Sequence, residues 1–581
     1  MKDWLHKHLD QIRLELARPD ALLMLVMVGL LAGILAGGVI VIFRYVVEGT
    51  LAGVLPGQHD ENFEGLPGWL RLVLPILGGM AIGLLFRWAS NGQTLMGVGR
   101  VLERLTYHQG YIGFREFLLQ FAGAAIALIS GQSVGREGPH VYLGAAAGSL
   151  LGQQLSLPNN SIRTLVGCGV AAAIAASFNT PLAGVIFALE VVMMEYTLVS
   201  FLPVMLAAVS GNAVSILFLG SAPAFVVPAL EMGSLLEMPA VVTLGLMTGT
   251  IAACFIHLSQ IFSRYGRAYP FWWQTTMAGL VVGVCALFAP EVMGVGYDTV
   301  SSALLGEYSL IALLIILCCK VVATSACGGF GVPAGMVGPS LFMGAIIGGI
   351  AGNLMNFWFP EVSSSTTFYV LLGMGAMMGA SLQAPLAGLT AMLELTHNPA
   401  VVMPGMLAIV VANLTASELF GKESIFITLL RSTGFEYRTS PVLQALRRIG
   451  VGSVMKKDFV RHDCIISREK AEKLLVEKPE WLLVEEDSHP VVLMHAVDLA
   501  RYIQNDAEAE EGGKEDIDLM EIPAWRAQVA PICLQANLQE ALELLGEKLV
   551  ESLYVEAVDP IGRHQIYGIL TREQIESAYH Y

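Results

Sequence analysis

Apolar segments follow one another along the chain from Ala21 to about residue 420. The first runs from Ala21 to Phe43 and exceeds the about 20 residues that a helix needs to cross a bilayer. The later segments lie near residues 71–86, 116–134, 141–152, 164–192, 198–219, 238–262, 271–289, 308–326, 338–358, 367–393 and 400–420. Those at 71–86 and 141–152 are short and bounded by glycine and proline, so they predict broken or re-entrant helices. Such backbone must be buried in protein or line a wet cavity, so the pattern predicts a pathway rather than an anchor.

The first twenty residues mix charged and apolar positions. An apolar stripe with i, i+4, i+7, i+11 spacing is formed by Leu5, Leu9, Ile12 and Leu16. This spacing predicts an amphipathic helix over residues 1–20. Four basic residues precede the first apolar segment: Lys2, Lys7, Arg13 and Arg18. Their position predicts a cytoplasmic N-terminus by the positive-inside bias.

Composition divides the chain into two parts. Hydrophobic residues make up 55% of the sequence and charged residues only 14%, whereas soluble proteins have about 25% charged residues. Residues 441–581 hold 15 Lys and Arg against 26 Asp and Glu, a net charge of −11 out of −16 for the chain. We therefore predict a membrane domain over 21–440 and an acidic soluble domain over 441–581. The negative charge argues against nucleic acid as a partner.

The membrane domain contains an internal repeat. Five positions recur at a separation of 200: Gly135, Gly138, Pro139, Gly144 and Gly148 match Gly335, Gly338, Pro339, Gly344 and Gly348. A second block, Asn179 to Glu190, recurs as Gln383 to Glu394 at a separation of 204. The repeat predicts two halves, about 21–225 and 226–440. Transporters of this architecture hold their substrate between half-helix ends.

The acidic domain alternates strand-like and helical runs. It opens with Val451 to Met455, and four strand-like runs follow at 481–484, 491–494, 553–555 and 566–570. We predict two similar α/β units, about 451–505 and 522–581. The run between them, Asp506 to Glu521, holds eight acids and one lysine and predicts a solvated linker.

The strongest chemical signal is Gly135-Arg136-Glu137-Gly138-Pro139, which joins two apolar segments. Glycines and a proline at a helix start leave backbone N–H groups free, and with the helix dipole these form an anion site. Glu137 lies inside this site and can act as a tethered competitor of an anion, leaving when it is protonated or displaced. The alternative is a helix-start acid neutralised by Arg136, which is disfavoured because adjacent side chains on a helix do not face each other.

Two further loops have glycines at a predicted helix start. Gly335-Met336-Val337-Gly338-Pro339 repeats the first motif without an ionisable group, and Gly97-Val98-Gly99 is a third glycine-flanked helix start. The Gly135 and Gly335 loops would present paired helix N-termini to one anion, and only the Gly135 loop carries a gate. The Gly97-Val98-Gly99 start is a weak signal by itself.

These motifs resemble the CLC family of chloride channels and chloride/proton exchangers. The resemblance rests on the loops above, the two repeat blocks, Gly421 to Phe426, and the acidic domain, which is similar to a cystathionine-beta-synthase (CBS) domain pair. It implies an all-α polytopic membrane domain built as an inverted repeat, with an α/β CBS pair. It also implies a homodimer with one pore in each subunit, cytoplasmic termini and Glu137 as the gating glutamate. The implied anion-binding positions are Gly97, Val98, Gly99, Gly135, Arg136, Gly138, Pro139, Gly335, Met336, Val337, Gly338, Pro339 and Phe426.

The chain departs from the family at the anion site. Family members usually offer the central anion a serine hydroxyl, a backbone N–H of the second loop and a tyrosine hydroxyl. The corresponding residues here are Val98, Val337 and Phe426. Without the two hydroxyls, main-chain N–H groups and water would coordinate the anion, and we expect weak discrimination among anions.

It also departs at the proton route. Family exchangers use a second, inner glutamate, and Val191 occupies that place. Because a valine cannot relay a proton, we favour anion permeation that is uncoupled or loosely coupled to protons. A stoichiometric exchanger that moves protons through water is the alternative, and an unrelated duplicated transporter for another anion is the second. For Glu190 we favour a structural role paired with its repeat partner Glu394.

Two ionisable residues have open roles. Lys320 ends an apolar run and matches the neutral Gln120 in the repeat. It either raises the positive potential of the anion path or extends to the membrane interface. His140 follows the gate motif, and we favour a histidine satisfied by neighbouring polar groups over a pH sensor.

Cofactors and other partners complete the predictions. Nucleotide-binding CBS units usually supply a Ser or Thr and, three residues later, an Asp. Here the pairs are His495 with Asp498 and Thr571 with Gln574, so an adenine nucleotide is doubtful and no cofactor is required. The eight cysteines show no CxxC spacing, so no metal site is predicted. We predict chloride-like anions, possible protons and lipid as partners, no enzymatic activity, and a bacterial inner-membrane location.

Overall fold

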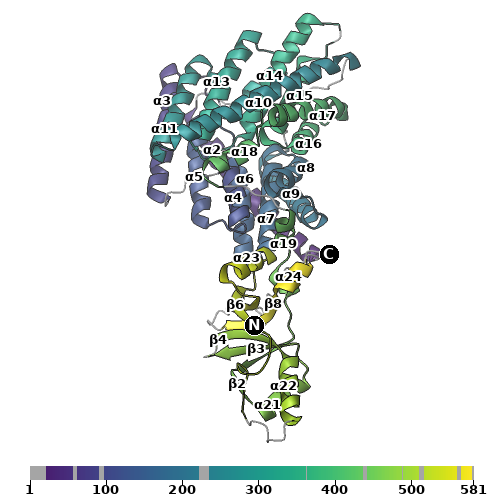
Figure 1. Ribbon diagram of the computed structural model, residues 1–581. Helices are drawn as coiled ribbons and strands as arrows, with labels where there is room; N and C mark the ends of the chain where they lie inside the picture. Colours follow the sequence, from purple (N-terminus) through teal and green to yellow (C-terminus); the bar gives the residue numbers. More distant parts are fainter. Residues whose placement is uncertain are drawn as a thin grey trace. The chain divides into compact units, whose positions relative to one another are not determined.

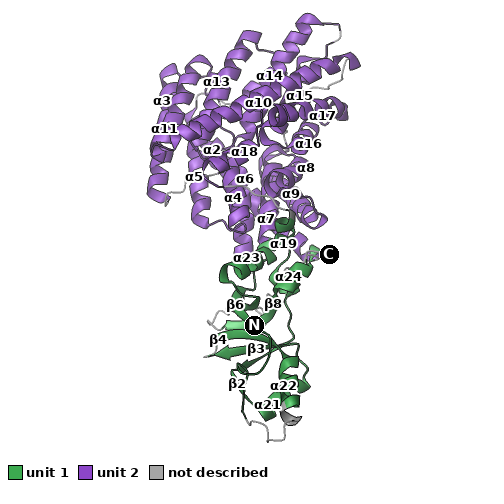
Figure 2. Cartoon of the chain, in the orientation of Figure 1, with its two compact units in different colours: residues 1–22, 155–161, 438–581 green, residues 23–154, 162–437 purple. Residues whose placement is uncertain are grey.

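The computed structural model describes most of the chain. The described residues are 21–55, 62–90, 97–221, 225, 234–361, 363–435, 441–486, 489–508, 516–558 and 564–578. The amphipathic helix predicted over residues 1–20 lies outside them. The chain divides into two compact units (Figure 2), and each is described by itself. Unit 1 comprises Met1–Leu22, Leu155–Ser161 and Arg438–Tyr581, and unit 2 comprises Leu23–Gln154 and Ile162–Tyr437.

Unit 2 is built from helices that follow the apolar pattern (Figure 1). The helices of the first half are α2 (Leu22–Val54), α3 (Gly68–Ala89), α4 (Gly97–Tyr107), α5 (Phe114–Ile129), α6 (Glu137–Gln154), α7 (Asn159–Phe178), α8 (Pro181–Phe187), the π-helix η1 (Ala188–Met193) and α9 (Leu198–Leu219). Those of the second half are η2 (Leu235–Glu237), α10 (Met238–Gly266), α11 (Phe271–Phe288), η3 (Pro290–Val292), α12 (Tyr297–Leu304), α13 (Leu310–Gly329), α14 (Val337–Trp358), α15 (Thr366–Leu382), α16 (Pro385–Thr396), η4 (Pro399–Val401), α17 (Val402–Leu414), the π-helix η5 (Thr415–Leu419) and α18 (Ile425–Ser432). Within the described ranges, nine helices are long and apolar enough to cross a membrane. The protein is therefore a polytopic membrane protein.

The prediction of a broken helix at 71–86 is wrong. Helix α3 has 22 residues and is long enough to span, because residues 68–70 and 87–89 continue the helix beyond the two ends of the apolar run. It continues through Pro75, whose carbonyl accepts a hydrogen bond from Gln132 Nε2 at 2.7 Å. The segment at 141–152 belongs to α6, which is not among the nine long apolar helices and starts at buried Glu137.

The two halves meet through reciprocal contacts, as an inverted repeat requires. The Gly135 N–H donates to the Gly335 carbonyl and the Gly335 N–H donates to the Gly135 carbonyl, both at 2.8 Å, in an antiparallel bridge. Glu190 of η1 accepts the first N–H groups of α16, and Glu394 of α16 accepts those of α8. The paired structural role favoured for Glu190 and Glu394 is confirmed.

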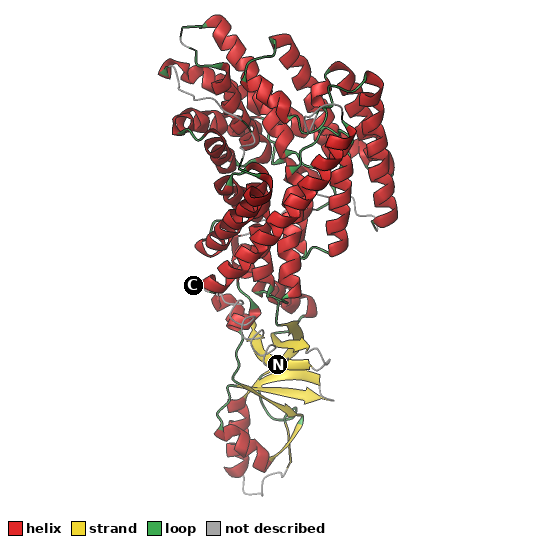
Figure 3. Cartoon of the chain, turned by 180° about the vertical axis from the view of Figure 1, so that it is seen from behind, coloured by secondary structure: helices red, strands yellow, loops and turns green. Residues whose placement is uncertain are grey.

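The strands of the described chain all lie in unit 1 (Figure 3). A six-stranded sheet has the order β1-β3-β4-β6-β7-β8, and β2 pairs with β5. The elements are α19 (Pro441–Arg448), α20 (Val451–Val454), β1 (Phe459–Asp463), β2 (Ile465–Ser467), α21 (Arg468–Val476), β3 (Trp481–Glu486), β4 (His489–His495), α22 (Ala496–Glu508), β5 (Asp516–Asp518), β6 (Arg526–Cys533), α23 (Leu538–Lys548), β7 (Ser552–Val558), β8 (His564–Thr571) and α24 (Arg572–Ala578). The order β-α-β-β-α occurs twice, and in each copy the first two long strands are parallel and the next is antiparallel. The repeat fits a CBS pair.

Two details of this unit differ from the predicted boundaries. Val451 and Met455 were expected to open the first α/β copy, about 451–505. They pack instead in the core of the second α/β copy, with Leu538 and Leu570. The predicted linker 506–521 contains the end of α22 and strand β5. Ile517 of β5 is buried in the core of the first α/β copy. The high charge of this segment predicted a linker, but the apolar Ile517 between two aspartates anchors a short strand.

Candidate functional site

The loops that start α6 and α14 touch backbone to backbone. A Cβ added to Gly138 would lie 2.5 Å from the Gly335 Cα, and one added to Gly335 would lie 2.4 Å from the Gly138 N. Both positions therefore require glycine, because any side chain would push the loops apart. Pro139 and Pro339 follow as buried residues of the first helical turns.

The carboxylate of Glu137 lies at this junction and is fully buried. Its Oε2 accepts the N–H of Gly338 at 3.0 Å, and its Oε1 accepts the hydroxyl of Tyr297. The Gly338 N–H belongs to the first turn of α14, where a free N–H and the helix dipole favour an anion. The sequence placed Glu137 at the donors of its own loop, whereas the structure places it at a donor of the second loop.

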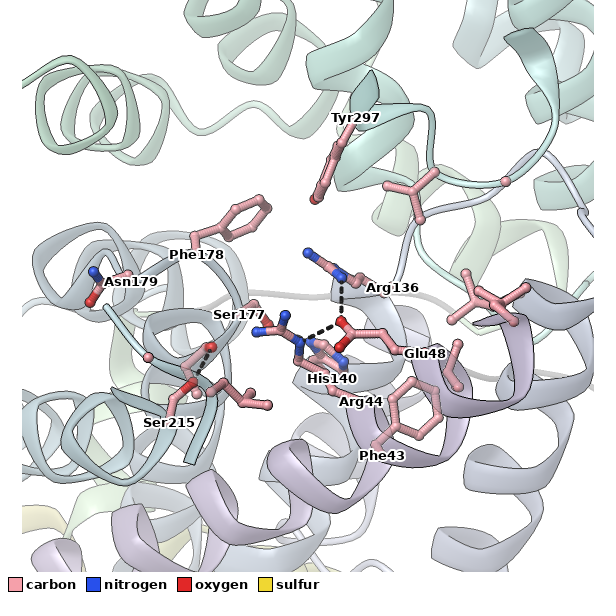
Figure 4. Close-up of a pocket in the computed structure, with 18 of the residues that line it drawn as sticks. Phe43, Arg44, Glu48, Arg136, His140, Ser177, Phe178, Asn179, Ser215 and Tyr297 are labelled. Atoms are coloured by element: carbon pink, nitrogen blue, oxygen red, sulfur yellow. Dashed lines mark hydrogen bonds and ion pairs between the residues drawn. The ribbon is translucent and has the colours of Figure 1, made fainter. Parts of the chain in front are cut away.

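Arg136 faces away from its neighbour, toward α2. Its Nη1 lies 3.1 Å from Glu48 Oε1, and the same oxygen lies 2.8 Å from Arg44 Nε (Figure 4). The Arg136 guanidinium also lies over the ring of Tyr297, 5.0 Å from its centroid. Arg136 is thus the ion-pair partner of Glu48, which speaks against the alternative that it neutralises Glu137.

A cavity of about 390 Å³ opens beside this network (Figure 4). We call it the Arg136 pocket; its polar lining residues include Arg44, Glu48, Arg136, His140, Asn179 and Tyr297. His140 is fully buried, and its Nδ1 pairs with the Ser177 hydroxyl. Its Nε2 has no hydrogen-bond partner in the described part of the chain. We predicted that polar neighbours form hydrogen bonds with His140, and this is true of one of its two ring nitrogens.

A second cavity, of about 400 Å³, lies beside the start of α4. We call it the Phe426 pocket, because it brings together Val98, Gly99, Met336 and Phe426 from three distant parts of the sequence. The N–H of Gly97 is occupied by Gln120 Oε1 at 2.9 Å, and Val337 does not line this pocket. Hydroxyl groups of Ser263, Ser432 and Thr433 also line it. Weak discrimination among anions stays a prediction.

Lys320 is fully buried, so its extension to the membrane interface is wrong. Its Nζ donates to the carbonyls of Val292 and Gly294 at 3.1 and 3.2 Å and lies 4.4 Å from the Phe342 ring centroid. It lines neither the Arg136 pocket nor the Phe426 pocket. Carbonyl groups and a ring face thus surround a cation that the apolar run carries into the core.

Val191 lies in η1 with 3% of its surface exposed. Its neighbour Glu190 accepts the N–H groups of Leu386 and Ala387 at 3.2 and 2.7 Å. Val191 is therefore a buried, apolar side chain, and the adjacent carboxylate of Glu190 is engaged in capping α16.

The residues considered for nucleotide binding are engaged with protein groups. The His495 ring stacks on Trp481, with centroids 4.0 Å apart, and Asp498 lies 3.8 Å from Arg501. The Thr571 N–H donates to Gln574 Oε1 at 3.0 Å, and the Gln574 N–H donates back to Thr571 Oγ1 at 3.4 Å. This reciprocal pair caps α24.

Sequence reasoning missed three residues of the network: Arg44, Glu48 and Tyr297. Arg44 and Glu48 lie four residues apart in the first apolar helix, and charges there are a signal of a functional position that could have been used. Tyr297 follows Gly294-Val295-Gly296. No local signal connects it to Glu137, which lies 160 residues earlier.

Comparisons with known proteins show which proteins the chain is similar to. Residues 78–417 match a family model described as voltage gated chloride channel. A putative chloride channel protein ClcB-like from Ralstonia nicotianae is 32% identical over 359 residues, covering 61% of this chain and 84% of the relative. The H(+)/Cl(−) exchange transporter ClcA from Vibrio cholerae is 28% identical over 435 residues, covering 73% and 92%.

Two solved structures share the fold. A slow cyanobacterial Cl−/H+ antiporter matches with a TM-score of 0.62 and 21% identity, over 71% of this chain and 97% of that chain. A eukaryotic CLC transporter matches with a TM-score of 0.60 and 19% identity, over 95% and 97%.

Proposed function

The chain belongs to the voltage-gated chloride channel (CLC) family, and on this premise we propose that it transports chloride and similar small anions past a gate formed by Glu137. The observation that carries the proposal is the hydrogen bond from the Gly338 N–H to the Glu137 carboxylate at 3.0 Å. A carboxylate on a helix-start donor is a bound anion attached to the chain.

The gate works by competition for this donor. While Glu137 is ionised, its carboxylate fills the position that a permeating anion needs. Protonation removes the charge and weakens the hydrogen bond from Gly338, so the side chain can leave and an anion can take its place. The Arg136 pocket and the Phe426 pocket would give anions access to the junction. The guanidinium groups of Arg44 and Arg136 add positive charge beside the first pocket.

We propose that permeation is uncoupled or loosely coupled to protons. Val191 is apolar and buried, so the described residues offer no ionisable side chain at the inner relay position. Stoichiometric exchange is a second candidate, favoured by relatives that are named exchange transporters or antiporters. In that case water would deliver the proton.

The assembly and its location are part of the same proposal. We expect a homodimer with one pathway in each subunit, in a bacterial inner membrane with both termini cytoplasmic. The four basic residues ahead of the first span support this orientation: Lys2, Lys7, Arg13 and Arg18.

Simultaneous chloride and pH recording from liposomes tests the gate. An imposed chloride gradient with valinomycin should drive chloride efflux without uphill proton movement. We expect Glu137→Gln to conduct at every pH, whereas flux through the unmodified protein should fall as pH rises, because only the carboxylate can compete with an anion. Glu307→Gln, which neutralises an exposed carboxylate, is the matched control.

Each other outcome has a defined meaning. Loss of all flux in Glu137→Gln would indicate a substrate-liganding glutamate and an unrelated transporter, which contradicts the proposal. Uphill proton movement in a fixed ratio to chloride would favour the exchanger.

A further inference from the structure

Tyr297 contacts the gate from a different helix. It is the first residue of α12, and its hydroxyl donates to Glu137 Oε1, while Gly338 donates to the other carboxylate oxygen. The carboxylate is thus held on one side by a backbone group and on the other by a side chain. The phenol is the donor that a substitution can remove.

Three groups fix the ring of Tyr297. The Arg136 guanidinium lies 5.0 Å from its centroid, the Phe225 ring lies at 5.0 Å, edge to face, and the Phe178 ring lies at 6.3 Å. Figure 4 shows the phenol pointing toward Arg136. Because Arg136 is itself paired with Glu48, the ring is packed against a charge that has a fixed position.

The turn that carries Tyr297 is also fixed. Lys320 donates to the Val292 and Gly294 carbonyls, and Phe342 packs under Gly296, 2.7 Å from where a Cβ would lie. Gly294 and Gly296 have φ of 62° and 79°, which favour glycine. The buried lysine therefore holds the backbone that delivers the phenol to the gate.

We propose that Tyr297 is a positioning residue that latches Glu137 in its closed position, and that Lys320 and Arg136 hold this latch in place. The inference rests on the proposed role of Glu137 as the gate and adds the group that determines how readily the gate leaves. Releasing the carboxylate requires breaking the phenol hydrogen bond as well as the Gly338 one.

The ionisable groups around Glu137 define the pH dependence of the latch. Tyr297 of α12 contacts it directly. Arg136 of its own loop pairs with Glu48 of α2, which also pairs with Arg44, and Lys320 of α13 contacts the turn before Tyr297. On its own helix, His140 pairs with Ser177. Tyr297→Phe removes only the hydroxyl and leaves the ring and its contacts with these groups.

The test compares chloride flux and its pH midpoint in Tyr297→Phe and the unmodified protein, in liposomes. A hydrogen bond to a charged group changes an equilibrium about ten-fold or more, so flux at neutral pH should rise roughly ten-fold. The pH at which flux is half-maximal should move upward by about one unit, the equivalent of a ten-fold change. A merely structural role would not move this midpoint. Tyr265→Phe, which removes an exposed phenolic hydroxyl near the C-terminal end of α10, is the matched control.

A double substitution separates the latch from the gate. Tyr297→Phe should have no further effect on flux in a Glu137→Ala background, because alanine offers no acceptor to the phenol. Unchanged flux and midpoint in Tyr297→Phe, or a decrease in flux, would overturn the latch while leaving the gate intact. An equal effect of Tyr297→Phe in both backgrounds would also overturn it. If Glu137→Gln itself leaves the pH dependence unchanged, the proposed function fails, and the latch with it.

Discussion

Glu64 is an acid whose charge changes near neutral pH. It lies between α2 and α3, beside Phe63, which lines the Arg136 pocket. Partial burial, together with the nearby carboxylates of Asp298 and Glu291, raises the pKa of Glu64 to about 7, against the opposing effect of Arg71. The folded protein therefore binds this proton more tightly than the unfolded chain does. The associated stabilisation is complete below the ordinary value of 4.5 and is lost as pH rises through 7.

We expect Glu64→Gln to raise the melting temperature at pH 8 and to have little effect at pH 4, because the amide stays neutral at both. Thermal unfolding of the detergent-solubilised protein at the two pH values measures this, with Glu307→Gln as the reference. An equal melting-temperature difference at both pH values would show that the charge of Glu64 is not the cause.

Individual residues differed in how far they could be predicted. Glu137 stands in a motif whose glycines and proline predict a helix start, and the family resemblance assigned Val98 and Phe426 to one anion site; these two residues do line one pocket. Tyr297 and Glu48 could not, because their partners lie 160 and 88 residues away and are selected by packing. For Lys320, the apolar run indicated that the side chain is buried, but only the fold shows which carbonyls accept its hydrogen bonds.

At the scale of elements, the reciprocal caps make a quantitative prediction. Glu190 accepts two N–H groups at the start of α16, and Glu394 accepts two at the start of α8. Loss of a helix cap costs about 0.5–2 kcal/mol. We expect Glu190→Gln and Glu394→Gln to lower the free energy of unfolding by similar amounts within that range, because each cap mirrors the other.

Chemical denaturation in mild detergent measures the two losses. Glu190→Gln should also leave the ratio of proton to chloride movement unchanged, since its carboxylate serves α16. A changed ratio would assign Glu190 to proton transfer and contradict the capping role.

Helix starts at glycine and proline were predictable because those residues have local effects on the backbone. Helix lengths were less predictable: the apolar run covers only 71–86, whereas α3 extends from Gly68 to Ala89. Trp69 before the run and Arg87 and Trp88 after it are polar or amphipathic, so a count of apolar positions ends short of them even though the backbone stays helical.

At the scale of the whole molecule, the acidic unit is a pair of β-α-β-β-α copies sharing one sheet. Its two copies were predictable from alternating strand and helix signals. The packing of Val451 and Met455 into the second copy was not, because a short apolar run can fit either core. Tertiary contacts alone decide between them.

Adenine nucleotides should not stabilise this unit. The His495 ring is stacked with Trp481 and lies 5.5 Å from Trp525, and the Thr571–Gln574 pair is closed on itself. Binding would have to break these contacts. Melting of the full-length protein with millimolar ATP or AMP, with sodium triphosphate as the ionic control, should show no nucleotide-specific shift. A rise in melting temperature at micromolar nucleotide would contradict this expectation.

The Gly135–Gly335 bridge has a consequence for biogenesis. Its two hydrogen bonds join residues 200 positions apart. When a ribosome has delivered only the first half, Glu137 therefore has neither Gly338 nor Tyr297 to bind. Non-local contacts of this kind form late, because a long loop must close before they are made. The nascent first half therefore lacks both donors that bind this carboxylate in the folded protein. The hydrogen bonds to Glu137 can form only when the second half arrives.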